Sequence, residues 1–227
     1  MRVILAALSA LFLFSTPARA EPDPSRAAAD RLVAAMGGAE AWSQAHGLII
    51  RARHWEAQLD APYENLIQMS LDEPHMRFEG DSPTMKRRRA VVGDTGWRVS
   101  EVRELGPMTP EQVADDVKWW EAHAYRNIGR LARKDPALIP RLHADGRLEL
   151  YRPDGARLMW YRLNGAGEPV AFGAWGNEQG SIFGPLVDRG GGVKLPAWAS
   201  SADGIFRAVL VEASALPSPP AANWDKP

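Results

Sequence analysis

The chain has no cysteine among its 227 residues. Disulfide bonds are therefore excluded, and an exported domain without them must be held together by the packing of its core. The same absence excludes a lipid anchor on a cysteine. An exported form of this chain is therefore expected to be soluble rather than anchored.

Long apolar runs are also missing. The run from Val3 to Phe14 is well short of the about 20 residues that a membrane-spanning helix needs, and no later stretch reaches that length. It follows Arg2 and precedes the small-residue site Ala18-Arg19-Ala20, which is the order of a cleavable secretory signal peptide. We therefore predict a signal peptide over residues 1–20, a periplasmic location and a single monomeric domain over residues 21–227.

The sequence has no excess of charge of either sign, because its formal net charge is −1. This balance argues against a general nucleic-acid or anionic-membrane binder. One basic run, Lys86-Arg87-Arg88-Arg89, stands out. No aromatic residue is interleaved with it, as stacking on bases would need, so we interpret it as an exposed strand face or a loop.

The standard motifs of catalysis and metal binding are absent. None of the five histidines belongs to an H-x-H or H-x-x-x-H pair, and there is no G-x-S-x-G, S-x-x-K or H-E-x-x-H sequence. Gly190 to Lys194 lacks the spacing of a phosphate-binding loop and is better explained as a hairpin loop. We therefore predict no cofactor, no metal and no enzymatic activity. An unrecognised hydrolase is a weaker alternative, for which His54, Glu56 and His75 are the first residues to consider.

Helical regions can be placed from the pattern of residues, among them a short one from about Ala39 to Ala45. Arg26 to Met36 has a helix-forming composition, follows the candidate N-cap Ser25 and is ended by Gly37-Gly38. Thr109 and Gln112 form a capping box in front of an apolar stripe, which predicts one long helix to about Lys134.

Strands are expected on both sides of the long helix. Alternating apolar residues and turn signals, with no β-α-β alternation, predict an antiparallel sheet covered by helices, an α+β fold. The expected strands are Gly47–Gln58, Asn65–Leu71, His75–Glu79, Thr84–Val92, Trp97–Val102, Arg147–Tyr151, Arg157–Leu163, Val170–Trp175, Ile182–Val187, Val193–Ser200 and Ile205–Ala213.

Several segments, in order, resemble the LolA/LolB-like (outer-membrane lipoprotein-sorting-like) superfamily of periplasmic carriers. They are Leu32–Gly38 with Ala41-Trp42, Leu71–Glu79, Gly93–Trp97, Gly106–Met108, Leu195-Pro196 and Asn223–Pro227. The resemblance implies a strongly curved antiparallel sheet, an incomplete β-barrel, covered by helices over a hydrophobic cavity. In the carriers proper an arginine precedes the proline of the Leu71–Glu79 step and ties the sheet to the helical lid. This sequence has Glu73 there.

The function that the resemblance implies is binding or transport of a lipophilic ligand or an acylated lipoprotein, without catalysis. On apolar faces of expected strands, the candidate cavity residues are Met76, Phe78, Trp97, Trp160 and Phe172. A second hypothesis is a ligand-free interaction or regulatory module that contacts envelope proteins. It predicts a filled interior and an exposed apolar patch.

Overall fold

One antiparallel sheet dominates the computed structural model, which describes residues 23–81, 86–99, 105–174, 176–222 and 224. Its thirteen strands run in the order β6-β5-β4-β3-β2-β1-β15-β14-β11-β10-β9-β8-β7, and the end strands β6 and β7 do not pair with each other. The expected α+β class with a curved, open antiparallel sheet is therefore confirmed. The predicted signal peptide, residues 1–20, lies outside the described residues.

The strands fall into two groups along the chain. The first comprises β1 (Gly47–Glu56), β2 (Tyr63–Ser70), β3 (His75–Asp81), β4 (Lys86–Val92), β5 (Thr95–Val99) and β6 (Leu105–Pro107). The second comprises β7 (Ile139–Leu142), β8 (Arg147–Tyr151), β9 (Arg157–Leu163), β10 (Pro169–Ala174), β11 (Ser181–Phe183), β12 (Leu186–Asp188), β13 (Lys194–Pro196), β14 (Trp198–Ser201) and β15 (Phe206–Leu216). β15 joins the groups because it pairs with both β1 and β14.

Alternation of side chains fixes which face of the sheet is inside. On β1, Leu48, Ile50 and Ala52 are buried, whereas Arg51 and Arg53 are exposed. A shift of one residue would turn every apolar side chain outward, so this pattern determines the register. The face that carries Ile50 is called the inner face below.

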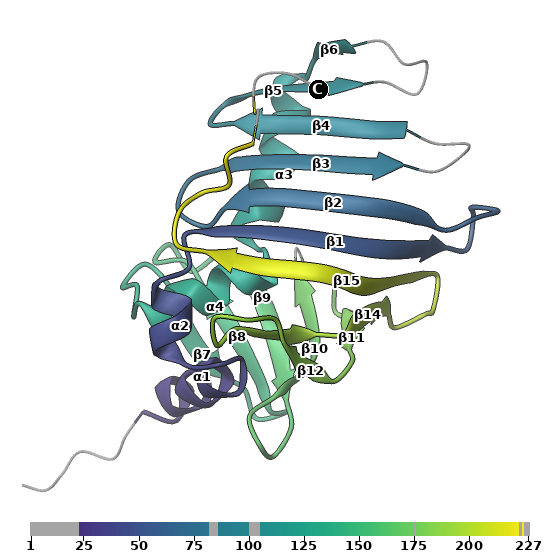
Figure 1. Ribbon diagram of the computed structural model, residues 1–227. Helices are drawn as coiled ribbons and strands as arrows, with labels where there is room; N and C mark the ends of the chain where they lie inside the picture. Colours follow the sequence, from purple (N-terminus) through teal and green to yellow (C-terminus); the bar gives the residue numbers. More distant parts are fainter. Residues whose placement is uncertain (1–22, 82–85, 100–104, 175, 223, 225–227) are drawn as a thin grey trace, which may run out of the picture.

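Four helices cover the inner face and one corner of the sheet: α1 (Pro24–Ala35), α2 (Ala39–Ser43), α3 (Pro110–Glu121) and α4 (Ala124–Ala132). Figure 1 shows α3 behind β1 to β5, with α1 and α2 beside β7 and β8. The N-cap of α1 is Asp23, whose carboxylate accepts from the amide of Ser25, so the predicted cap Ser25 was wrong by two residues.

The two glycines after α1 end the helix as predicted. Gly37 has φ 118°, and a Cβ there would lie 1.9 Å from the carbonyl oxygen of Gly192. The loop that contains Gly192 joins the paired strands β12 and β13, so the hairpin expected there is confirmed. Only glycine allows this loop to approach the end of α1 so closely.

The predicted long helix is in fact two helices. α3 ends at Glu121, and His123, with extended backbone, is the N-cap of α4. The fully buried side chain of Asn127 donates to the carbonyls of Glu121 and His123, at 2.9 Å and 3.2 Å. The carbonyl of His123 also accepts from the backbone N–H of Asn127 at 3.1 Å, so the carbonyl that the break releases is that of Glu121. Because the Asn127 amide satisfies it, the chain can turn there without losing its apolar stripe.

Candidate ligand cavity

A cavity of about 680 Å³ lies between α3 and the inner face of β1 to β5. Its apolar lining consists of Ile67, Phe78, Val99, Met108, Trp119 and Phe206, and its polar lining of His54, Tyr63, Asn65, Gln112, Asp115, Asp116, Arg87, Arg88, Arg89 and Arg98. Gly80 also lines the cavity, with backbone atoms only. The side of the cavity formed by β1 and β2 carries no arginine, whereas the side formed by β4 and β5 carries three on the inner face, Arg87, Arg89 and Arg98.

Strand register explains this gradient. One row of directly paired residues crosses the inner face through Ile67, Phe78, Arg89 and Arg98. Adjacent strands lie about 4.8 Å apart, so the row passes from aliphatic to aromatic to cationic within a short distance. The cavity is therefore amphipathic along the direction that crosses the strands.

Gly80 keeps the floor of the cavity open. It lies in a second row, paired with Asn65 on β2 and Arg87 on β4. A Cβ at Gly80 would make ordinary contact, at 3.6 Å, with the ring of Tyr63. The backbone there does not require glycine, and what the glycine supplies is space.

The polar end of the cavity is a chain of hydrogen bonds around His54. Tyr63 donates to the carboxylate of Glu56, so the hydroxyl oxygen of Tyr63 can accept from His54 Nδ1, 3.2 Å away. Asn65 Nδ2 then donates to His54 Nε2, at 3.3 Å. Burial lowers the pKa of His54 to about 4, and burial together with the Glu56 bond raises that of Tyr63. His54 is therefore neutral near pH 7.

The three residues considered for a hydrolase do not all converge on one point. The structure brings His54 and Glu56 together through Tyr63, but His75 lies at the start of β3, 3.6 Å from Glu73. The lone pair of His54 Nε2 is already used by Asn65. Of the described residues that line the cavity, none is a serine or cysteine that could act as a nucleophile.

One arginine of the lining is held by α3. Arg89 Nε lies 2.8 Å from Asp116 Oδ2, and its guanidinium lies 4.3 Å from the centre of the Phe78 ring. Burial raises the pKa of Asp116, and the charge and hydrogen bond of Arg89 act in the opposite direction without cancelling this rise. Arg87 and Arg98, by contrast, have no carboxylate within 4.0 Å among the described residues.

The predicted cavity residues occupy three different environments. Phe78 lines the cavity, and Met76 is fully buried two residues before it on β3. Trp97 and Trp160 lie on the outer face of the sheet, where Trp97 Nε1 donates to the Trp224 carbonyl at 2.7 Å. Phe172 lies on the inner face but in the second half of the sheet, stacked on Phe183 at 4.4 Å.

A row of aromatic rings connects the two halves of the inner face. It begins at Phe78 and ends at Phe172, with successive centroid distances of 4.9, 4.6, 5.4, 6.3 and 4.4 Å. The rings between them belong to Trp119, His123, Tyr125 and Phe183. The apolar wall of the cavity therefore continues along the helices to β10 and β11.

The basic run was interpreted as an exposed strand face or a loop, and it is strand β4. Arg87 and Arg89 point to the inner face, while Arg88 lies on the outer face near Glu79. In a strand, residues 87 and 89 lie on the face opposite residue 88, and this alternation could have assigned two of the three arginines to the cavity. The sequence alone does not say which face of this strand is inside.

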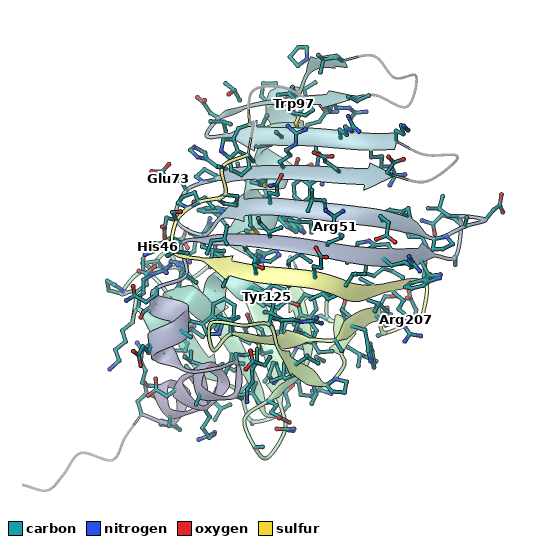
Figure 2. All side chains as sticks on the ribbon, in the orientation of Figure 1. His46, Arg51, Glu73, Trp97, Tyr125 and Arg207 are labelled. Atoms are coloured by element: carbon teal, nitrogen blue, oxygen red, sulfur yellow. The ribbon has the colours of Figure 1, made fainter. Side chains whose placement is uncertain are left out.

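Contacts beside Glu73 join the sheet to the helices. Glu73 lies at the end of the sheet near His46 (Figure 2), where its carboxylate is 3.6 Å from His75, and the pairs with His46 and Arg133 belong to Asp72. Asp72 lies 2.6 Å from His46 Nδ1 and 3.4 Å from Arg133, the C-cap of α4. Trp120 Nε1 adds a buried hydrogen bond of 2.7 Å to the carbonyl of Ser70.

The comparisons with known proteins return solved structures only. The chain matches no protein-family model and no curated protein. It is similar to a DUF1329 family protein from Desulfovibrio piger, with 10% identity over 85% of this chain and 92% of that chain and a TM-score of 0.38. It is also similar to an outer membrane lipoprotein-sorting protein domain from Vibrio parahaemolyticus, with 7% identity over 84% and 91% and a TM-score of 0.36. The second is of the kind that the sequence resemblance led us to expect.

Two further findings concern membranes and metals. Among the helices that the structure describes, none is long and apolar enough to cross a membrane. Across the same ranges, no group of three or more His, Cys, Asp or Glu side chains is placed to hold a metal ion.

Proposed function

We propose that this protein is a periplasmic binding or carrier protein for a lipophilic or acylated partner, which it holds in the cavity beneath α3 without catalysis. The observation that carries the proposal is the cavity itself, about 680 Å³ between α3 and an inner face that carries Ile67 and Phe78. This volume falls within the about 300–1,000 Å³ of small-molecule sites.

The energetics of apolar transfer support this function. Each methylene group moved from water into an apolar site contributes about 0.8 kcal/mol. A few methylenes against Ile67, Phe78 and Trp119 would therefore give useful affinity without specific polar recognition. The polar network around His54 is internally satisfied, so it would not need to bond the ligand.

The open interior favours binding over a ligand-free interaction module. That alternative predicts a filled core and an exposed apolar patch. The cavity of about 680 Å³ is the observation that differs from a filled core. The predicted signal peptide over residues 1–20 supports the periplasmic location.

A contact quencher tests the proposal. A monoacylglycerol with bromine atoms along its chain quenches only those tryptophans that its chain touches, and Trp119 lines the cavity. We expect saturable quenching of the purified protein that is largely lost in Trp119→Phe. Trp198→Phe is the matched control, because Trp198 is not among the lining residues, and it should keep the quenching. Absence of saturable quenching in the unmodified protein would overturn the proposal.

A further inference from the structure

The basic side of the cavity identifies the chemistry of the ligand. Resting on the proposed function, we propose that the ligand is an anionic amphiphile, whose acidic head lies against Arg87 and Arg98 and whose apolar chain lies against Ile67, Phe78 and Trp119. The head group is a carboxylate or a phosphate, since guanidinium groups bind both with paired N–H donors.

The first argument is the balance of charge around the cavity. Three arginines of the inner face, Arg87, Arg89 and Arg98, and two aspartates line it, whereas Arg88 lies on the outer face, 4.0 Å from Glu79. Arg89 is paired with Asp116 at 2.8 Å, and Asp115 with Lys118 at 3.5 Å. After these pairs are formed, the uncompensated charge of the lining is positive.

The second argument is the position of that charge. Arg98 carries the last side chain of the row through Ile67 and Phe78, beyond which the row reaches Gly106, and Arg87 follows Gly80 in the second row. Arg87 is exposed and Arg98 is half-buried, so they stand at the rim and not in the interior. An extended molecule that follows either row would have its polar end at the rim and its chain inside.

The third argument is that the opposite end of the cavity, as far as its described residues go, offers no free cation, since the charge beside it is the carboxylate of Glu56. His54 is neutral near pH 7, and its ring nitrogens are bonded to Tyr63 and Asn65. A head group would find no free cation there. The cavity therefore favours one orientation of an amphiphile, with the acid at Arg87 and Arg98.

Three amphiphiles with the same chain test this inference. Myristate, myristyl alcohol and myristylamine differ in the charge of the head, and each is titrated below its micelle concentration at low salt. We expect myristate to bind about tenfold more tightly than the alcohol, equivalent to about 1.4 kcal/mol, and the amine to bind most weakly. Added salt should reduce the preference for myristate, because the rim is exposed.

Variants locate the effect. In the double variant Arg87→Gln and Arg98→Gln, the preference for myristate over the alcohol should disappear. The matched control is Arg51→Gln with Arg207→Gln, since Arg51 pairs with Glu212 on β15 and Arg207 lies over Trp198, outside the cavity lining. It should keep the full preference.

The outcomes separate this inference from the proposed function. Equal affinity for myristate and the alcohol overturns the anionic ligand and leaves the carrier proposal standing. A preference that survives in the Arg87→Gln, Arg98→Gln variant overturns the assigned head-group position. If none of the three compounds binds saturably, the carrier proposal itself fails.

Discussion

Arg89 on β4 and Asp116 on α3 form an ion pair across the cavity, with 2.8 Å between Arg89 Nε and Asp116 Oδ2. The same guanidinium packs over the ring of Phe78. One side chain thus joins the sheet to the covering helix and contacts the apolar wall. The pair determines how closely α3 lies over β4.

The first prediction concerns this pair. Asp116→Asn should lower the free energy of unfolding by about 1–2 kcal/mol, because a charge-assisted hydrogen bond at a mostly buried carboxylate is lost. Urea unfolding at neutral pH measures it. Asp115→Asn is the control, since its side chain is 77% exposed and its pair with Lys118 should contribute less than about 0.5 kcal/mol. Equal effects of the two changes would mean that Arg89 does not hold α3.

The second prediction uses the space at Gly80. Gly80→Val should weaken binding of a brominated monoacylglycerol severalfold, because the new side chain occupies the floor of the cavity. The free energy of unfolding should stay the same or rise by up to about 1 kcal/mol, since glycine is unfavourable within a strand. Fluorescence titration and urea unfolding measure the two quantities.

Gly106→Val is the matched control. Gly106 lies on strand β6, where an added Cβ would meet open space, and it does not line the cavity. The change should therefore leave binding unaltered. Undiminished binding in Gly80→Val would show that the ligand does not use the space beside Tyr63.

Local sequence signals predicted most of the elements, and contacts between distant residues account for the errors. The alternation of Ile50 and Arg51 predicted β1, and the capping box of Thr109 and Gln112 predicted the start of α3. The end of α3 was missed because Asn127 has the same polar character whether it faces solvent or caps a broken helix. Its role depends on the path of the chain.

The cavity could not be derived in the same way. An apolar residue on a strand has two possible faces, and only pairing with neighbouring strands chooses between them. Phe78 and Trp97 were both predicted to face inward, yet Trp97 lies on the outer face, bonded to the carbonyl of Trp224, 127 positions away. The space at Gly80 likewise appears only when β2, β3 and β4 are in register.

The third prediction concerns the break between α3 and α4. Asn127→Leu should lower the free energy of unfolding by about 1–3 kcal/mol, because the carbonyl of Glu121 loses its shortest donor and that of His123 keeps only the backbone N–H of residue 127. Asn127→Gln carries the same amide on a longer stem, and it should restore part of the loss. Chemical denaturation monitored by circular dichroism measures the difference. A stability in Asn127→Leu equal to that of the unmodified protein would show that water satisfies these carbonyls.

The fourth prediction is a pH dependence of stability that originates at His54. Its pKa is about 4 in the folded protein, against 6.5 as the ordinary value, because the imidazole is buried. Between these values the unfolded chain binds a proton that the folded protein does not. The free energy of unfolding should therefore fall as the pH drops through this window, and be independent of His54 above it. From about pH 7 to about pH 5 the loss due to His54 is about 2 kcal/mol.

The His54→Gln variant isolates this contribution. Urea unfolding at several pH values should show a shallower loss in this variant, by about 2 kcal/mol over the same range. His123 remains, and burial lowers its pKa to about 3, so part of the slope should persist. The control Trp198→Phe removes no titratable group, and it should leave the slope unchanged. An identical slope in His54→Gln and the unmodified protein would mean that protonated His54 is accommodated in the fold, and that this end of the cavity is open to water.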